Sequence, residues 1–504
     1  MSVEEVFVTP VIKEILNKYR VIWAIGHASA LMGWDLEVYM PPAGVKERSA
    51  ASAELGVLSQ RLLLDPEFVS LVEKASEAEL ANDYEKGLVR VLKREIDKMR
   101  KIPPEVLREL IKTTGEAQVV WREAKKKSDF SMFRPYLEKI VELERKIAEY
   151  LGYEEHPYDA LLDLYEEGIT VRDLDPVFSR LETELRKVID KVLSEGLFPQ
   201  WHPLEDLAYR KEDLRELNQA TLKMLGYPLG ERARLDESAH PFTQSIGIND
   251  VRITTRYEGK DFKRSYLAVI HEFGHALYEL QIDERLAMTP LASGVSLGIH
   301  ESQSRFWENM VARSKAFVYA TYPLIEKYLP FVSGYGPEEV FLYFNIVRPS
   351  LIRVEADEVT YNMHIILRYR LEKALIEGSM EVSDLPSAWN DLMDKLLGVR
   401  PKNDAEGVLQ DIHWSMGSIG YFPTYTLGTL AAAQIAEAIE KDLGSLEETI
   451  RGKEFGRLRD WLREKIHRWG ATYPPKELLR RAVGEGYSAD AFIRYIQRKY
   501  LSPN

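Results

Sequence analysis

Cysteine is absent from the 504 residues of the sequence, and its absence excludes three kinds of chemistry. A chain without cysteine has no disulfide bonds, no thiolate metal ligands and no nucleophilic thiol. Any bound metal ion must therefore be held by histidine, aspartate or glutamate side chains.

Long apolar segments are also scarce. The N-terminal residues, MSVEEVFVTP, have acids early and no basic segment followed by an apolar one, so we expect no secretory signal. The most apolar run, Leu427 to Ile439, is shorter than the ~20 residues that a membrane-spanning helix needs. We expect a buried helix there, no membrane partner and a cytoplasmic protein.

The sequence has no excess of positive charge. It contains 67 basic and 80 acidic residues, which gives a formal net charge of −13. Nucleic acids and anionic membranes attract basic surfaces. We therefore expect no nucleic-acid partner, and we interpret the charge as favouring solubility.

Apolar residues recur with the period of a helix along most of the chain. Leu88, Leu92, Ile96 and Met99 follow one another at spacings of four, four and three, with charged residues between them. Similar patterns occur between residues 106 and 111, between 137 and 151, and from Pro475 onward. The sequence predicts an all-α protein, and one helical catalytic unit over residues 1–504, because no repeat or long linker interrupts the pattern.

One segment departs from the helical period. Val251, Ile253 and Tyr257 alternate with polar residues after a turn at residues 247–250, which predicts a short strand. A peptide substrate in extended form could add to the edge of such a strand. The alternative is that the strand only supports the helix that follows it.

That following helix carries the sequence His-Glu-Phe-Gly-His at residues 271–275. Residues four apart lie on one face of a helix, so His271 and His275 can bind one metal ion. Glu272 then lies beside the metal and can take a proton from a water molecule that the metal acidifies. Gly274 suggests close packing against another segment. This pattern predicts a metallopeptidase; the alternative is two histidines without a metal.

A catalytic metal site needs a third ligand, and the nearest rich cluster is His300-Glu301-Ser302-Gln303. Glu301 would lie near the start of a second helix that packs beside the first and continues through Ser304, Phe306, Trp307, Met310 and Val311. His300 or Glu308 could ligate instead, or Glu301 could stabilise a helix N-terminus.

The chain resembles the carboxypeptidase Taq family of thermostable HExxH metallopeptidases over nearly its whole length. Six separated segments carry the resemblance: 240–242 (HPF), 250–254 (DVRIT), 271–275 (HEFGH), 300–303 (HESQ), 352–357 (IRVEAD) and 407–414 (GVLQDIHW). The resemblance implies His271, His275 and Glu301 as metal ligands and Glu272 as the general base.

The resemblance further implies a broad-specificity carboxypeptidase that acts on peptides with a free C-terminus. It implies one divalent metal ion per chain, zinc or cobalt, in a gluzincin-like site. The expected fold is helical with a small sheet and two lobes that flank a deep groove, as in neurolysin and angiotensin-converting enzyme. A homodimer is expected from the resemblance alone.

A carboxypeptidase must bind the terminal carboxylate of its substrate, and the planar fork of an arginine suits that task. Arg353 is the first candidate and Arg252 the second. The alternative for Arg353 is an ion pair with Asp357, four residues later. His240 and Phe242 are candidates for shaping the terminal pocket; His240 could equally be structural.

The oxyanion of the tetrahedral intermediate needs a hydrogen-bond donor. His413 and Tyr421, in a segment rich in glycine and aromatic residues, are the candidates, and Tyr425 is a weaker one. The alternative for His413 is a buried histidine bound to Asp411. Carboxylates behind a metal site often accept the other ring N–H of a ligand histidine, and Asp357 and Asp411 are candidates for this role.

Two other functions remain open at this stage. An oligopeptidase of the same shape, cutting inside its substrates, would have the same metal site. A peptide-binding protein without activity would need no base, which the presence of Glu272 disfavours.

Overall fold

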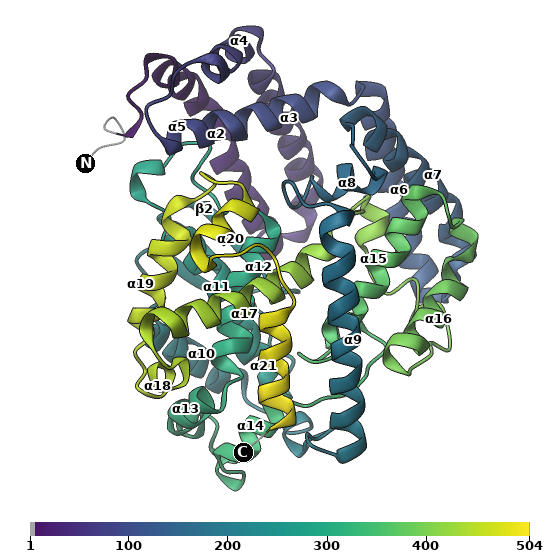
Figure 1. Ribbon diagram of the computed structural model, residues 1–504, viewed down its shortest axis with the longest axis vertical. Coiled ribbons are helices and arrows are strands. Elements are labelled where there is room, and N and C mark those ends of the chain that lie inside the picture. The colour runs from purple at the N-terminus through teal and green to yellow at the C-terminus, as the bar shows by residue number, and fades with distance from the viewer. Residues whose placement is uncertain (1–5, 503–504) are drawn as a thin grey trace. The chain divides into compact units, whose positions relative to one another are not determined.

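The computed structural model describes residues 6–502, and the chain in it is predominantly helical with one small sheet (Figure 1). The start of the chain at residues 1–5, considered above for a secretory signal, lies outside the described residues. The predicted fold class, helical with a small sheet beside the His-Glu helix, is confirmed.

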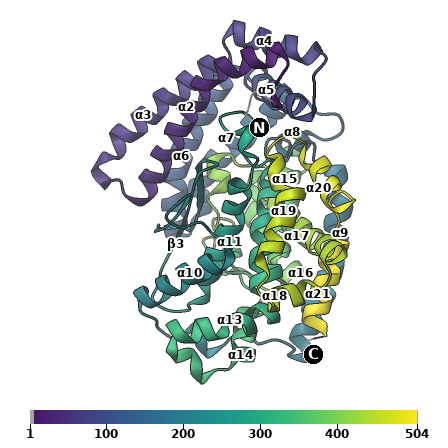
Figure 2. The same cartoon turned by 90° about the vertical axis from the view of Figure 1, so that its left-hand side faces the viewer.

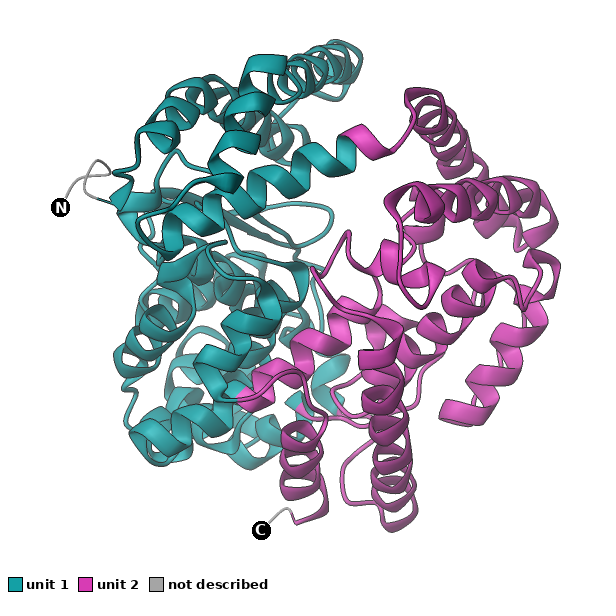
Figure 3. Ribbon diagram, turned by 45° about the horizontal axis from the view of Figure 1, so that its top comes forward, with its two compact units in different colours: residues 1–99, 203–344, 435–484 teal, residues 100–202, 345–434, 485–504 magenta. Residues whose placement is uncertain are grey.

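Contacts between Cα atoms divide the chain into two compact units, each built from three separate stretches (Figure 3). Unit 1 comprises the described residues up to 99, 203–344 and 435–484. Unit 2 comprises residues 100–202, 345–434 and the described residues from 485 onward. Each unit is therefore assembled from chain segments that lie far apart in the sequence.

Unit 1 holds the sheet and most of the helices around it. Its helices are α2 (Pro10–Val38), α3 (Val45–Leu63), α4 (Pro66–Glu77), α5 (Asp83–Lys101, of which the last two residues fall in unit 2), α10 (Lys211–Leu225), α11 (Lys263–Leu280), α12 (Leu297–Arg305), α13 (Lys315–Tyr328), α14 (Pro337–Phe344), α18 (Leu446–Arg451), α19 (Phe455–Lys465) and α20 (Pro475–Val483). Figure 2 shows α2 and α3 side by side at the N-terminal end.

The predicted helical period at residues 88–99 corresponds to α5. Leu88, Leu92 and Ile96 are buried in the hydrophobic core of the N-terminal helices, and Met99 packs against it. Because residues three and four apart share one face of a helix, one apolar stripe of α5 enters this core. The prediction of a helix with one buried face is confirmed here.

The sheet has three strands in the order β1-β3-β2, where β1 is Ala233–Glu237, β2 is Thr243–Gly247 and β3 is Asp250–Thr255. β1 pairs with β3 in parallel and β2 pairs with β3 antiparallel. The predicted strand is β3, which begins at Asp250, the last residue of the predicted turn. Since β3 is central and paired on both sides, the expectation that a peptide adds to its edge is wrong.

Unit 2 consists of helices and their connections. They are α6 (Pro104–Lys127), α7 (Phe130–Leu151), α8 (Pro157–Leu162), α9 (Val171–Glu195), α15 (Tyr361–Glu377), α16 (Leu385–Leu397) and α21 (Asp490–Leu501). Figure 1 shows α21 beside α9, although almost 300 residues separate them in the chain, and the two helices are in contact.

The apolar run at residues 427–439 lies in α17 (Pro423–Leu443), which begins in unit 2 and ends in unit 1. All side chains from Leu427 to Ala436 are buried, so the prediction of a buried helix is confirmed. Among residues 6–502, none of the helices combines the length and the apolar character needed to cross a membrane.

Candidate metal centre and active site

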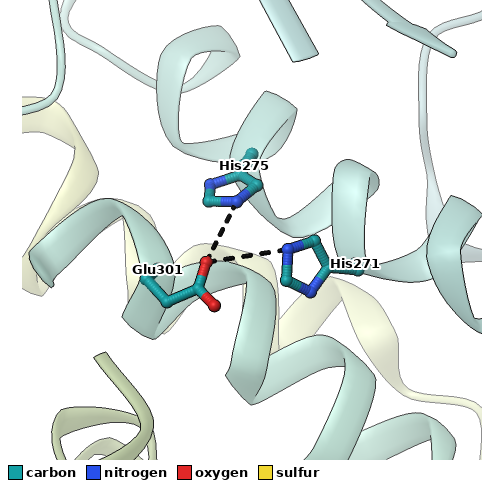
Figure 4. A group of neighbouring side chains, drawn as sticks. All are labelled: His271, His275 and Glu301. Carbon is teal, nitrogen blue, oxygen red and sulfur yellow. Dashed lines mark ion pairs between the residues drawn. The ribbon is translucent and has the colours of Figure 1, made fainter. Parts of the chain in front are cut away.

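Three predicted ligands meet in unit 1. His271 and His275 lie one turn apart on α11, and Glu301 comes from α12 (Figure 4). Oε2 of Glu301 lies 3.6 Å from Nε2 of His271 and 3.3 Å from Nε2 of His275. The three residues thus direct one ligand atom each toward a common point.

These distances fit a small divalent metal ion. Ligand atoms ~2.1 Å from one ion at tetrahedral angles are about 3.4 Å apart. Burial opposes ionisation of Glu301, but Arg305 and His271 outweigh it and hold the pKa of this carboxyl well below its usual range. The set therefore offers two imidazoles and one carboxylate, the donors of many catalytic zinc sites.

Gly274 allows the two helices to come close enough for this arrangement. A Cβ atom at residue 274 would lie 2.4 Å from the carbonyl oxygen of Gln303 and 2.6 Å from Cα of Ser304. Such distances are far below van der Waals contact. The close packing predicted at Gly274 is confirmed. Glycine is required at this position because the backbone of α12 lies against it.

The other ring nitrogens of the two histidines also have partners. Nδ1 of His271 lies 2.8 Å from Oε2 of Glu308, and Nδ1 of His275 lies 2.8 Å from Nδ1 of His300. Nε2 of His300 in turn lies 2.7 Å from Oε1 of Glu279. Such contacts fix the orientation of a ligand ring.

This finding corrects two expectations. The carboxylates predicted to accept from the ligand histidines, Asp357 and Asp411, have other partners in unit 2, and Glu308 and His300 contact these rings instead. His300 and Glu308, considered above as alternative ligands, thus lie behind the ligand rings.

Glu308 reaches His271 from a π-helix, Phe306–Ala312, that continues α12. The sequence predicted an ordinary helix here. The wider π turn is seen in the hydrogen bond from the amide of Arg313 to the carbonyl of Glu308, five residues earlier. Arg305 and Arg313 pair with the Glu308 carboxylate. Burial opposes ionisation of Glu308, but Arg305 and His271 outweigh it and hold the pKa of this carboxyl far below its usual range.

Glu272, the predicted base, follows His271 on α11 and is buried. Its Oε2 accepts a hydrogen bond of 2.6 Å from the hydroxyl of Thr243 on β2. The sheet thus orients the Glu272 carboxylate. This contact is a structural reason for the sheet to lie beside α11. Sequence reasoning missed Thr243, because only the packing of β2 against α11 brings it there.

The other predicted residues of unit 1 lie elsewhere. His240 is exposed in the connection between β1 and β2, and Phe242 directly precedes β2. Arg252 is paired with Asp250 through two hydrogen bonds of 2.7 Å, and its guanidinium lies 4.4 Å from the ring centre of Trp34. None of these three has a described contact with the metal ligands.

A second cluster lies in unit 2, around Arg353. The Nε and Nη2 atoms of Arg353 donate to Oδ1 of Asp411, at 3.1 and 2.9 Å, and Nη1 donates to the hydroxyl of Tyr361. Arg368, fully buried on α15, donates to Oδ2 of the same aspartate at 2.7 Å. Burial opposes ionisation of Asp411, but the two guanidinium groups hold its pKa well below the usual range.

The alternative for Arg353, an ion pair with Asp357, is not what the structure shows. Asp357 instead accepts from the amides of Val359 and Thr360 before α15, and from the amide of Arg348. Arg368 was missed by sequence reasoning. The only feature of the sequence that could have indicated Arg368 is its position as a charged residue within an otherwise buried face of α15.

His413 and Tyr421 lie together in this cluster. Their ring centres are 5.3 Å apart, and Nε2 of His413 lies 3.4 Å from the hydroxyl of Tyr425. Burial, with Arg353 and Arg368, lowers the pKa of His413 to about 4, although Asp411 opposes this shift. His413 is therefore neutral near pH 7. The alternative, a direct hydrogen bond to Asp411, does not occur: the Asp411 carboxylate is bound to the arginines.

The chain matches the carboxypeptidase Taq (M32) metallopeptidase family over residues 14–500. It is 59% identical to thermostable carboxypeptidase 1 of Pyrococcus furiosus over 498 residues, which cover 99% of this chain and all of that protein. It is 39% identical to carboxypeptidase 1 of Bacillus subtilis, with 97% of each chain covered.

Solved structures show the same likeness. The apo-Mg structure of the Pyrococcus furiosus carboxypeptidase superposes with a TM-score of 0.97, covering 98% of this chain and 100% of that one, at 58% identity. The predicted resemblance is thereby confirmed. This chain belongs to the carboxypeptidase Taq (M32) family and is a metallopeptidase of the carboxypeptidase type.

Proposed function

We propose that this protein hydrolyses the C-terminal peptide bond of peptides at a metal ion held by His271, His275 and Glu301. The observation that carries the proposal is the spacing of the three donor atoms, with the Glu272 carboxylate on the same helix. We assign Glu272 the role of general base, because a carboxylate beside the metal can accept a proton from the attacking water.

The metal, when bound, supplies Lewis acidity, which acidifies water and polarises the scissile carbonyl. The residues around it do the rest. Glu308 and His300 hold the ligand rings in place, and Thr243 orients Glu272. Glu272 then passes the proton it has accepted to the leaving amine. Replacing Glu272 with Gln removes the base, and full turnover in that variant would contradict its role.

We assign Arg353 to the terminal carboxylate of the substrate, with Arg252 as the second candidate. Of the five N–H donors of a guanidinium, the described hydrogen bonds of Arg353 use three, which leaves two for a ligand. Asp411 fixes the plane of the guanidinium, so its fork is held in one orientation. Arg252, by contrast, already donates to both oxygens of Asp250.

We assign His413 and Tyr421 to the oxyanion of the tetrahedral intermediate. A neutral imidazole can donate one N–H, and the low pKa of His413 keeps the ring neutral through the range in which peptidases act. His240, exposed beside the start of β2, is proposed to contact the substrate near its C-terminal residue.

A test of chain-end specificity separates this proposal from internal cleavage. A defined peptide with a free C-terminus is compared with the same peptide amidated at that end. We expect at least a ~30-fold loss of kcat/KM for the amidated peptide, because it lacks the carboxylate that accepts the charge-assisted hydrogen bonds. Loss of these hydrogen bonds costs about 2 kcal/mol of transition-state stabilisation. Equal cleavage of both peptides would establish an oligopeptidase instead. Assays with several C-terminal residues test the proposed broad specificity.

The proposed metal is zinc, with cobalt as the second candidate, because both ions accept two imidazoles and a carboxylate. Elemental analysis of protein purified without added ions decides between them. Activity restored to the metal-free protein by each ion in turn provides the functional comparison.

The homodimer and the cytoplasmic location stay predictions. Val45, Val57 and Leu58 on α3 are 50, 50 and 40% exposed, and exposed apolar side chains of this kind support a protein contact. Light scattering of the purified protein tests the dimer, and charged substitutions at Val57 and Leu58 should weaken it. Cell fractionation tests the location.

A further inference from the structure

A buried carboxylate in unit 2 holds the segment that connects the two proposed oxyanion residues. This segment, residues 413–421, runs from His413 through a short 3-10 helix (His413–Met416) to Tyr421. Glu372 on α15 is fully buried beneath it. Oε1 of Glu372 accepts from the indole nitrogen of Trp414 at 2.8 Å, and Oε2 accepts from the amide of Gly420 at 2.9 Å.

The positions of these two donors make the contact specific. Trp414 is the direct neighbour of His413, and Gly420 is the direct neighbour of Tyr421. One side chain therefore fixes the segment at both ends, next to each proposed donor. A third donor, the hydroxyl of Tyr158 on α8, binds Oε2 of Glu372 at 2.5 Å and holds the carboxylate itself in place.

Backbone packing leaves the segment little room to move. Gly420 has a φ of +98°, and a Cβ atom there would lie 2.8 Å from the carbonyl oxygen of Leu161 on α8. Gly417 has a φ of +73°, and a Cβ atom there would lie 3.1 Å from Oε1 of Glu144 on α7. The segment therefore follows the surface of α7 and α8 closely, and Glu372 supplies its polar anchor.

Burial raises the pKa of the Glu372 carboxyl to about 7, although the hydrogen bonds from Tyr158, Trp414 and Gly420 favour its ionised form. Hydrogen bonds to a carboxylate are shorter and stronger than those between neutral groups. A buried indole N–H or amide N–H that loses its acceptor carries the full cost of desolvation. Loss of the Glu372 carboxylate would leave the Trp414 and Gly420 donors to find new partners by moving the segment.

We infer that Glu372 is a positioning residue of this enzyme, which sets the places of His413 and Tyr421 through Trp414 and Gly420. The inference rests on the proposed function of His413 and Tyr421. It adds that their geometry depends on a carboxylate that does not touch the substrate.

The test compares Glu372→Gln with Glu358→Gln. Glu358 is the control, because it is also a buried unit 2 carboxylate that accepts from tyrosine hydroxyls, those of Tyr495 and Tyr500. It lies away from the segment and, unlike Glu372, is also paired with Lys499. Hydrogen–deuterium exchange of the peptide spanning residues 413–421 is measured alongside kcat and KM. For Glu372→Gln we expect faster exchange in this peptide and a kcat reduced at least ~10-fold, with KM changed less than ~3-fold.

Trp414→Phe removes one donor and leaves the carboxylate, so it serves if Glu372→Gln does not fold. It should show the same pattern with a smaller loss of kcat. Unchanged exchange of the 413–421 peptide in both variants would overturn the inference. So would an equal loss of kcat in Glu358→Gln, since the effect would then be general.

Tyr421→Phe and His413→Gln separate failure of the inference from failure of the proposed function. If both variants keep full kcat, the segment has no role in turnover, and the proposed oxyanion role and the inference fall together. If they lose kcat while Glu372→Gln keeps it, only the inference fails. If Tyr421→Phe, His413→Gln and Glu372→Gln all lower kcat, the reductions caused by Glu372→Gln and Tyr421→Phe should not multiply in the double variant. The reason is that both substitutions act through the Tyr421 hydroxyl.

Discussion

The hydroxyl of Thr243 donates to Oε2 of Glu272 across the contact between β2 and α11, at 2.6 Å. A hydrogen bond to a charged group is worth about 1.5–3 kcal/mol. Thr243→Val keeps the shape of the side chain and removes the donor. We therefore expect kcat to fall about 10- to 100-fold with the metal content unchanged, measured by steady-state kinetics and elemental analysis.

Thr243→Ser is the control for this prediction, since serine keeps the hydroxyl. It should retain most of the activity that Thr243→Val loses. A valine variant with the kcat of the unchanged protein would show that Glu272 needs no orientation by the sheet.

Gly274→Ala tests the close approach of α11 and α12. The added methyl group would overlap the backbone at Gln303 and Ser304, so the helix that carries Glu301 must move. We expect metal affinity to fall at least ~10-fold and the melting temperature to drop by several degrees, because overpacking costs about 1–3 kcal/mol. Metal titration and thermal unfolding provide the measurements.

Gly56→Ala on α3 is the matched control, because a Cβ atom there would meet nothing within 4 Å. Alanine in an open helical position stabilises a helix by about 0.5–1 kcal/mol relative to glycine. The same substitution should thus have opposite effects at the two positions. Unchanged metal affinity in Gly274→Ala would contradict the proposed packing constraint.

Removal of the metal should lower stability, because an ion that binds only the folded chain stabilises it by mass action. At a free concentration ~1,000 times Kd this amounts to about 4 kcal/mol. Thermal unfolding before and after treatment with a chelator measures the effect. Glu301→Gln, which weakens the site, should unfold at nearly the same temperature with and without the chelator; an equal drop in both proteins would point to a second metal site.

The buried acid Glu144 predicts a loss of stability at high pH. Burial and the nearby Glu372 raise the pKa of Glu144 to about 8, whereas an unfolded chain has a glutamate pKa of about 4.3. The folded protein thus keeps this proton more tightly, and the associated stability, complete below about pH 4.3, is lost as pH rises through 8. Glu144→Gln has no proton to lose and should avoid this loss.

Urea unfolding at pH 6 and pH 9.5 checks this prediction. We expect the variant to gain at least about 2 kcal/mol over the unchanged protein between the two pH values, since each pKa unit is worth about 1.4 kcal/mol. Glu142→Gln, half exposed on the same helix, should show no such gain. Equal pH dependence in Glu144→Gln and the unchanged protein would contradict the raised pKa.

The sequence predicted those parts of the site that depend on local periodicity. His271 and His275 share a face of α11 because any helix places residues four apart together. Glu301 could be proposed from its spacing and the family resemblance, yet its meeting with the histidines depends on the contact at Gly274. The predicted strand was also correct, but its central place in the sheet depends on pairing with β1 and β2, which periodicity does not reveal.

Long-range contacts account for what the sequence did not predict. The partner of Arg353 is Asp411, 58 residues later, and not Asp357, four residues later, because Arg353 lies in a 3-10 turn before α15 and not within a helix. The orienting groups Thr243 and Glu308 come from other elements than α11. The predicted groove between two lobes stays a prediction.

The π-helix after Arg305 limits how this site can be transferred to a designed protein. A designer who copies His271, His275 and Glu301 onto two straight α-helices reproduces the three ligand positions. Glu308, however, follows a change of helical pitch, so on a regular helix the same residue number points in another direction. The grafted His271 ring would then lose the contact at Nδ1 that fixes its orientation, and the copied site should bind metal more weakly than the natural one. The seven-residue π-helix is thus part of what a designer would have to copy.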